Sequence, residues 1–224
     1  MGLIPVNTSR HAQDLHEVTQ HYGRLASCYD TRWRGYTEGT LRYALELLQL
    51  TGAEQVLDVG CGTGELARVA CERWPSLALI GVDVTAAMVA VARRKLCGMS
   101  GASFALARSE TLPFGEARFD AAVCCNMLHH VPDPAKMIQE CGRVLRPQGV
   151  MVLVDWCRDF WHCGLMHGWL RLVDQTYVRM YRLRELQALV EAQGLSVDTG
   201  GRFLVPPCYG MMGLRAIKLV RASA

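Results

Sequence analysis

A short stretch, VLDVGCGTGE at residues 56–65, constrains the fold of this chain more than any other feature. Four residues suited to a buried strand lead into three glycines at alternate positions, Gly60, Gly62 and Gly64, and Glu65 then opens a helical pattern. Glycine permits the backbone conformations of a tight turn and lets another molecule approach the main chain closely. The stretch therefore predicts a strand–turn–helix unit with a binding site at the turn.

Strand and helix patterns alternate from residue 55 to the end of the chain. The predicted strands read VLDV, LALIGVD, SFALA, FDAAVCC, VMVLVD, LSVDT and LRAIKLV, and the predicted helices between them cover 65–74, 86–96, 134–145 and 183–193. Because strands that alternate with helices usually pair in parallel, the pattern predicts an α/β fold with helices on both faces of the sheet. In such sheets, ligands bind beyond the carboxyl ends of the strands.

Two segments lie outside this alternation, and they divide the predicted single domain of residues 1–224 into four parts. Residues 1–50 form an N-terminal helical cap and 51–155 form the core that carries the glycine turn. Residues 156–181 are an insertion, and 182–224 supply a C-terminal helix and strands.

The insertion is rich in aromatic residues: Trp156, Phe160, Trp161, Trp169, Tyr177 and Tyr181. One set of its apolar residues follows helical spacing, namely Phe160, Cys163, Met166, Leu170 and Val173. Such a stripe is typical of a helix face that packs into a core. The aromatic side chains either bound a ligand pocket or belong to that core.

Composition argues against several classes of protein. The net charge is only +3, without a long basic stripe, which does not favour a nucleic-acid partner. No apolar run approaches the ~20 residues of a membrane helix, and residues 1–14 lack the apolar core of a signal peptide. The ten cysteines form no C-x-x-C pair, so we expect free thiols, no metal site and a cytoplasmic protein. A homodimer is compatible with the sequence but cannot be read from it.

The glycine spacing and one carboxylate distinguish between the ligands that such a glycine turn accepts. Dinucleotide-binding turns follow G-x-G-x-x-G, whereas here the third glycine, Gly64, comes one place early. Asp58, at the strand end, would repel a pyrophosphate but attract the ammonium group of an amino acid. Asp83, which ends the next strand, can accept both hydroxyls of a ribose, a feature that both ligand classes share. The turn therefore suits a ligand with a cationic tail and no phosphates.

Five motifs, in this order and spacing, resemble those of class I S-adenosylmethionine-dependent methyltransferases: VLDVGCGTGE, GVDVT, SETLPF, FDAAVCCNMLHHVPDP and RVLRPQGVMVLVDW. The chain is similar to the small-molecule branch that includes ubiquinone and menaquinone C-methyltransferases, and YGRLASCYD resembles its tyrosine-containing cap. The resemblance covers about residues 20–155. It implies a Rossmann-like, seven-stranded, mostly parallel sheet with helices on both faces and an antiparallel last strand.

The resemblance also implies a site for S-adenosylmethionine and its product S-adenosylhomocysteine. The implied binding residues, from the methionine end through ribose and adenine to the cap, are Asp58, Gly60, Cys61, Gly62, Gly64, Asn126, Met127, Asp83, Val84, Ser109, Glu110, Tyr22 and Tyr29. The two tyrosines would close over the cofactor or pack between helices.

One position departs from the family. An acidic residue that accepts from the adenine amino group is expected where this chain has Arg108, whose guanidinium has donors only. A backbone carbonyl or Glu110 would have to take over that contact.

The implied reaction is an in-line displacement at the methyl carbon of a sulfonium, onto a small organic acceptor. Because the leaving thioether is neutral, a base is needed only where the acceptor must lose a proton. His129 follows the fourth strand and Asp155 ends the fifth, so both are candidate catalytic residues. We expect His130 to be structural, since LHHV is common in the family whatever the acceptor, and residues 156–181 to form a lid over the acceptor.

Other functions stay open on the sequence alone. A dinucleotide-dependent oxidoreductase could use the same fold, and a non-catalytic S-adenosylmethionine-binding protein could keep the same site. Methylation of a metalloid would need Cys124 and Cys125 to act together, but neighbouring residues of a strand face opposite ways. The fourth strand leads into NMLH and not into the two prolines and aromatic of nucleic-acid amino-methylating enzymes.

Overall fold

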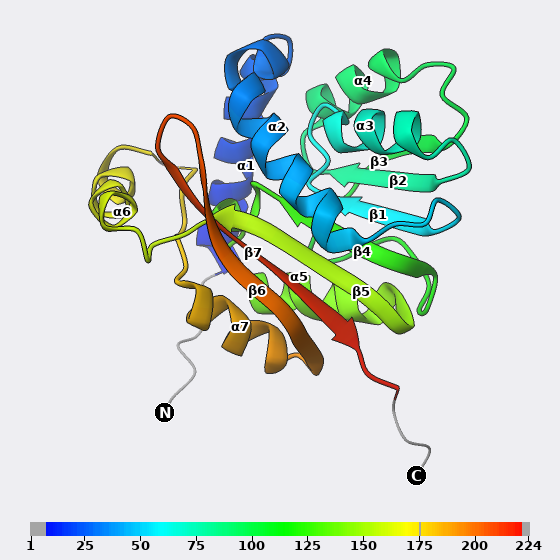
Figure 1. Ribbon diagram of the computed structural model, residues 1–224. Helices are drawn as coiled ribbons and strands as arrows, with labels where there is room; N and C mark the ends of the chain where they lie inside the picture. The colour runs from blue at the N-terminus through cyan, green and yellow to red at the C-terminus, as the bar shows by residue number, and fades with distance from the viewer. Residues whose placement is uncertain (1–7, 175, 221–224) are drawn as a thin grey trace.

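The computed structural model describes residues 8–174 and 176–220, with side chains from residue 16 onward, so residues 1–7 of the expected cap lie outside it. It contains one seven-stranded sheet between two layers of helices (Figure 1). The strands are β1 (Gln55–Val59), β2 (Ala78–Asp83), β3 (Ala102–Leu106), β4 (Phe119–Cys125), β5 (Leu145–Trp156), β6 (Leu195–Val205) and β7 (Tyr209–Lys218). The helices are α1 (Thr8–Leu25), α2 (Tyr29–Leu48), α3 (Glu65–Arg73), α4 (Ala86–Lys95), the 3-10 turn η1 (Leu128–His130), α5 (Pro134–Val144), α6 (Trp161–Val173) and α7 (Leu183–Glu191).

The strand order is β3-β2-β1-β4-β5-β7-β6. Strands β1 to β5 pair in parallel, and β7 runs antiparallel to both of its neighbours. The predicted fold class is confirmed, including the antiparallel last strand. The order reverses between β1 and β4, and the carboxyl ends of these two strands form the switch point at which α/β sheets bind ligands.

Alternate residues of the buried strands enter two separate cores, one on each face of the sheet. In β1, Val56 packs with α2, α3 and α4, whereas its neighbour Leu57 packs with α5 and α7 (Figure 1). The vicinal cysteines divide in the same way, with Cys124 in the second of these cores and Cys125 against the first. Their opposite orientation is the one that strand periodicity predicts, and all ten cysteines are free thiols.

Strand β6 is longer than the sequence predicts. It continues past residue 199 to Val205, through Gly200 and Gly201. Tyr43 of α2 lies over this part of the sheet: a Cβ on Gly201 would meet its Oη at 2.9 Å, and one on Gly213 would meet its Cε1 at 2.5 Å. Tyr43 also stacks on Phe203, with ring centroids 4.0 Å apart. The glycines therefore do not end the strand but let α2 lie close to it.

The insertion at 156–181 contains α6. Cys163 and Leu170 are buried against Tyr177 and Met180, as the predicted core stripe requires, but Val173 of that stripe is exposed, which corrects the prediction at this position. No helix within residues 8–174 and 176–220 combines the length and the apolar character needed to cross a membrane.

The close contact at Gly213 can be tested by adding one methyl group. We expect Gly213→Ala to lower the free energy of unfolding by about 1–3 kcal/mol, because Tyr43 must move away from the sheet. Gly35→Ala, in the exposed part of α2 with no atom near the new Cβ, should raise it by up to ~1 kcal/mol through helix propensity. Urea unfolding of both variants measures the difference, and equal effects would contradict this account of the α2–sheet contact.

Candidate active site

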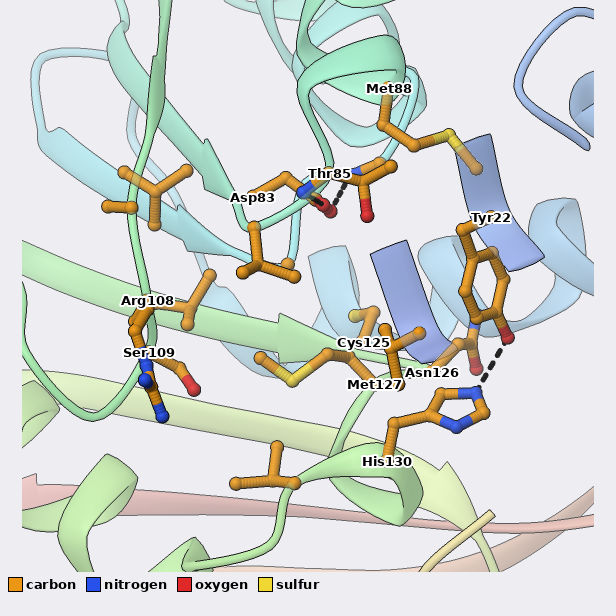
Figure 2. Close-up of a pocket in the computed structure, with 18 of the residues that line it drawn as sticks. Tyr22, Asp83, Thr85, Met88, Arg108, Ser109, Cys125, Asn126, Met127 and His130 are labelled. Atoms are coloured by element: carbon orange, nitrogen blue, oxygen red, sulfur yellow. Dashed lines mark hydrogen bonds between the residues drawn. The ribbon is translucent and has the colours of Figure 1, made fainter. Parts of the chain in front are cut away.

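A hollow lies at the carboxyl ends of β1, β2 and β4 (Figure 2). Its volume is about 910 Å³, including the open space above the lining atoms. Helix α1 and the start of α2 line its other side. Ten of the thirteen predicted cofactor-binding residues line it: Tyr22, Tyr29, Gly60, Gly62, Asp83, Val84, Ser109, Glu110, Asn126 and Met127. The sequence therefore locates this hollow, although Asp58, Cys61 and Gly64 do not line it.

The glycine turn borders the hollow with its backbone. The amides of Gly60 and Cys61 both donate to the Val82 carbonyl, at 2.8 and 3.0 Å, which fixes the turn against β2. Gly62 has a φ of 52°, and a Cβ built on it would meet no protein atom within 4 Å. A side chain at this position would therefore enter the open space, and glycine keeps that space free for a ligand.

The three predicted residues outside the hollow support the turn from behind. A Cβ on Gly64 would lie 3.0 Å from both Leu96 and Phe104, so this glycine lets α3 begin close to its neighbours. Cys61 is buried, as is Asp58. These positions support the wall of the hollow without lining it.

Two carboxylates, the buried Asp58 and the partly buried Asp83, make this end of the hollow favourable to a cation. Burial, reinforced by nearby Asp83, raises the pKa of Asp58 to about 7. Burial also raises the pKa of Asp83, although the amides of Thr85 and Gly62 donate to its Oδ1 and Oδ2 at 2.8 and 3.0 Å. A positive group bound beside these carboxyls would favour their ionised forms, whereas a phosphate would not.

Helix α1 closes one side of the hollow through a hydrogen-bonded histidine (Figure 2). The Nδ1 of His130 lies 2.7 Å from the Thr176 carbonyl, which can only accept, so Nδ1 carries the proton. Tyr22 of α1 then donates to Nε2 of His130 at 2.6 Å. Burial and the neighbouring His129 lower the pKa of His130 to about 3, so this imidazole is neutral near pH 7.

The start of α2 is tethered to the glycine turn beside Tyr29. Asp30 accepts from Thr63 Oγ1 and from Lys95 Nζ, both at 2.5 Å. Lys95 also pairs with Glu65 at 3.1 Å, so three elements meet at this ammonium. Burial, together with Asp83, raises the pKa of Tyr29 to about 12, which keeps its hydroxyl protonated as a donor at the hollow.

Asn126 joins the end of β4 to the same helix. Its φ of 56° lies in the left-handed region, which asparagine tolerates better than most residues. Its Oδ1 accepts from Tyr36 at 2.8 Å and its Nδ2 donates to Thr40 at 2.7 Å. Because residues of α2 form hydrogen bonds with both the oxygen and the nitrogen of this amide, the side chain of Asn126 has a fixed orientation at the hollow.

The candidate catalytic residues His129 and Asp155 form a buried pair behind the wall of the hollow. His129 Nδ1 lies 2.7 Å from Asp155 Oδ1, and the imidazole stacks on Trp156 with ring planes 5° apart. Burial opposes ionisation of Asp155, yet its pKa lies below the ordinary value because the His129 ring and the amides of Trp156 and His129 favour the carboxylate. Neither member of the pair lines the hollow, whereas His130 does.

The part of the hollow predicted to hold adenine contains Arg108, the expected departure. Arg108 lines the hollow, and its guanidinium lies 3.8 Å from Glu110, whose other oxygen accepts from Ser109 Oγ at 3.0 Å. The sequence did not identify several lining residues: Val18, Thr85, Met88, Cys125, His130, Val131 and Pro132. Their positions in the sequence could have indicated them, because each lies within a few residues of a predicted cofactor-binding residue. Within the described residues, no group of three His, Cys, Asp or Glu is placed to hold a metal ion.

Comparison with known proteins agrees with this geometry. Residues 56–149 match the family model described as a methyltransferase domain. A ubiquinone/menaquinone biosynthesis C-methyltransferase from Citrifermentans bemidjiense is 33% identical over 132 residues, which cover 56% of this chain and 52% of that protein. Across three curated relatives the matched part spans 47% to 62% of their length, so it represents about half of each.

Two solved structures share the fold. A chain in the complex of the Haloferax volcanii Trm112 methyltransferase activator with a methyltransferase superposes with a TM-score of 0.79 at 17% identity, covering 89% of this chain and 98% of that one. The [4+2]-cyclase SpnF superposes with a TM-score of 0.75 at 19% identity, covering 91% and 95%. At these identities the likeness concerns the fold alone.

The buried pair can be tested through stability. We expect Asp155→Ala to lower the free energy of unfolding by about 3–5 kcal/mol, because it leaves the buried His129 ring without its partner. Asp155→Asn keeps an oxygen that can accept from Nδ1 and should cost clearly less. Urea unfolding of both variants at pH 7 gives the comparison. If the alanine variant is as stable as the parent, the pair does not hold η1 to the end of β5.

Proposed function

We propose that this chain, whose residues 56–149 match the methyltransferase domain model, transfers a methyl group from S-adenosylmethionine to a small organic acceptor. The observation that carries the proposal is an open glycine turn flanked by two carboxylates, the buried Asp58 and the partly buried Asp83. That combination favours a cationic amino acid joined to a ribose over a pyrophosphate.

The residues around the hollow are compatible with this cofactor in shape and in hydrogen bonding. Gly62 leaves space above its backbone, and each oxygen of Asp83 keeps a lone pair beyond the one used by a backbone amide. When bound, S-adenosylmethionine supplies a methyl group on a cationic sulfur that leaves as a neutral thioether. Asp83 would hold the ribose, Asp58 would act electrostatically through the turn, and Tyr22 and Tyr29 would cover the ligand and exclude water.

The acceptor that we favour is a phenol or hydroquinone ring. The curated relatives named for ubiquinone and menaquinone biosynthesis support this class.

In-line displacement requires the acceptor to approach opposite the sulfur, so most of the protein's contribution is alignment. Because His129 and Asp155 lie behind the wall, we expect them to position β4 and β5, with residues 156–181 closing the acceptor side. Ten free thiols are what a reducing cytoplasm would maintain.

The proposal is tested by ligand identity and then by turnover. Calorimetry should show S-adenosylhomocysteine binding much more tightly than NAD, and tighter NAD binding would overturn the proposal in favour of an oxidoreductase. A panel of phenols and hydroquinones with labelled S-adenosylmethionine then separates an enzyme from a protein that only binds the cofactor. This second step is necessary because the same fold also serves the [4+2]-cyclase SpnF.

Two substitutions test the placement of the cofactor. Asp83→Ala should weaken S-adenosylhomocysteine binding by about 1–3 kcal/mol, because ribose hydroxyls lose a charged acceptor. Gly62→Val should weaken it further, because its side chain would occupy the open space over the turn. Calorimetry on variants that keep the parent's circular dichroism measures both effects. Full affinity in either folded variant would place the cofactor elsewhere.

Binding should also depend on pH through Asp58. In the free protein the pKa of this carboxyl is about 7, and a bound cation should lower it, so binding at acid pH must first displace a proton. Affinity for S-adenosylhomocysteine should therefore rise about tenfold from pH 6 to pH 8 and then level off. Asp58→Asn should flatten the profile. Calorimetry in two buffers of different ionisation enthalpy detects the released proton, and its absence at pH 6 would contradict the assignment.

A further inference from the structure

Helix α6 carries an apolar stripe that no described part of the chain covers. Side chains spaced i, i+4, i+8 and i+11 are 78%, 70%, 60% and 86% exposed, and they are Trp161, Leu165, Trp169 and Leu172. The opposite face is apolar too and packs onto the protein through Cys163 and Leu170. Apart from His162, His167 and Arg171, α6 consists of apolar residues and glycines, and a helix of that composition is normally buried on most sides. The stripe therefore needs a partner.

The charges around the stripe indicate the chemistry of that partner. The sequence of α6 contains no acidic residue, and its one arginine, Arg171, is exposed next to Leu172. Between residues 158 and 185 the chain has five arginines, two aspartates and one glutamate. Glu185 pairs with Arg158 and Arg179, and Arg182 and Arg184 are exposed. Tryptophans and leucines with a basic margin are typical of helices that lie at the surface of anionic membranes.

The size of the stripe favours lipid over a second copy of the chain. Thirteen residues make a helix of about 20 Å, too short to cross a hydrocarbon layer of about 30 Å but suited to lie in its plane. A stable protein–protein interface needs about 20–30 residues from each side. The stripe offers five exposed apolar side chains of one helix, with Val173 as the fifth.

We propose that α6 docks this protein onto an anionic membrane surface, with the stripe inserted at the level of the lipid headgroups. Figure 1 shows α6 at the margin of the molecule, away from α3 and α4, where a flat surface can reach it. The start of α6 is held to the body by the β6–β7 hairpin, since Phe160 and Cys163 pack against Gly210.

The docking face is linked to the candidate active site. Trp169 and Val173 also line a second hollow between α6 and α1, together with His21, Arg24 and Thr176. The carbonyl of Thr176 holds His130, which lines the first hollow. An acceptor dissolved in the membrane would thus meet the protein near the second hollow, which the hydrogen bond between Thr176 and His130 links to the first. This step alone rests on the proposed function.

Vesicle flotation tests the docking directly. The full chain should float with vesicles of phosphatidylcholine and phosphatidylglycerol at 3:1, less with phosphatidylcholine alone, and less in high salt. The double substitution Leu165→Glu and Leu172→Glu should weaken binding at least tenfold. The matched control is Leu106→Glu, an apolar residue 57% exposed on β3, which should bind within twofold of the parent. Melting temperatures show that the variants are folded.

Three results would overturn the inference. They are failure of the parent chain to float with either vesicle, a double variant that binds like the parent, and a parent dimer in sedimentation velocity that the double variant converts to monomer. The last result would assign the stripe to a second copy. Because flotation requires neither cofactor nor acceptor, its failure leaves the methyl-transfer proposal standing, and the converse also holds. Quenching of tryptophan fluorescence by brominated lipid gives an independent readout of Trp161 and Trp169.

Discussion

Backbone hydrogen bonds between the glycine turn and the end of β2 determine the geometry of everything around the hollow. Strand pairing between β1 and β2 ends at Val59 and Val82, and the Val82 carbonyl then accepts from two further amides of the turn. Asp83 accepts the next amide, that of Gly62, at 3.0 Å. The turn is therefore an extension of the sheet and not a loose loop. The closeness of Asp83 to the buried Asp58 disfavours ionisation of both carboxyls, and a cationic ligand would offset that cost.

The helical cap is part of the same unit. Lys95 and Thr63 hold Asp30 at the first turn of α2, and Asn126 holds Tyr36 and Thr40 about two turns further on. One attachment comes from the β1 turn and the other from the end of β4, two strands that pair directly in the sheet. Helix α2 is therefore fixed to two neighbouring strand ends. Tyr29, at the start of α2, is thereby placed at the hollow.

The fold could be predicted from the sequence because nearly every strand is a short apolar run bounded by Gly, Pro or Asp, and most of the site lies at strand ends. The two histidines after β4 show the limit of that reasoning. Which of His129 and His130 faces the hollow depends on the 3-10 turn η1 and on Asp155 and Thr176, which are remote in sequence. Val18 was missed for a related reason, because its place at the hollow depends on how α1 packs. The length of β6 depends on Tyr43, since glycines end a strand only where nothing packs on them.

The free thiols differ in their accessibility to alkylation, so the pattern of alkylation reports whether the protein is folded and whether the hollow is occupied. Cys28, Cys97 and Cys208 are exposed and open to alkylation, whereas six other cysteines are enclosed in the folded chain. Cys125 differs from both groups because it lines the hollow while burial raises the pKa of its thiol, so little reactive thiolate forms near neutral pH. Three sites should therefore be modified quickly, one slowly, and the rest only as the chain unfolds. Shielding of the slow site by a ligand would make the mass of an alkylated sample a direct count of occupied molecules.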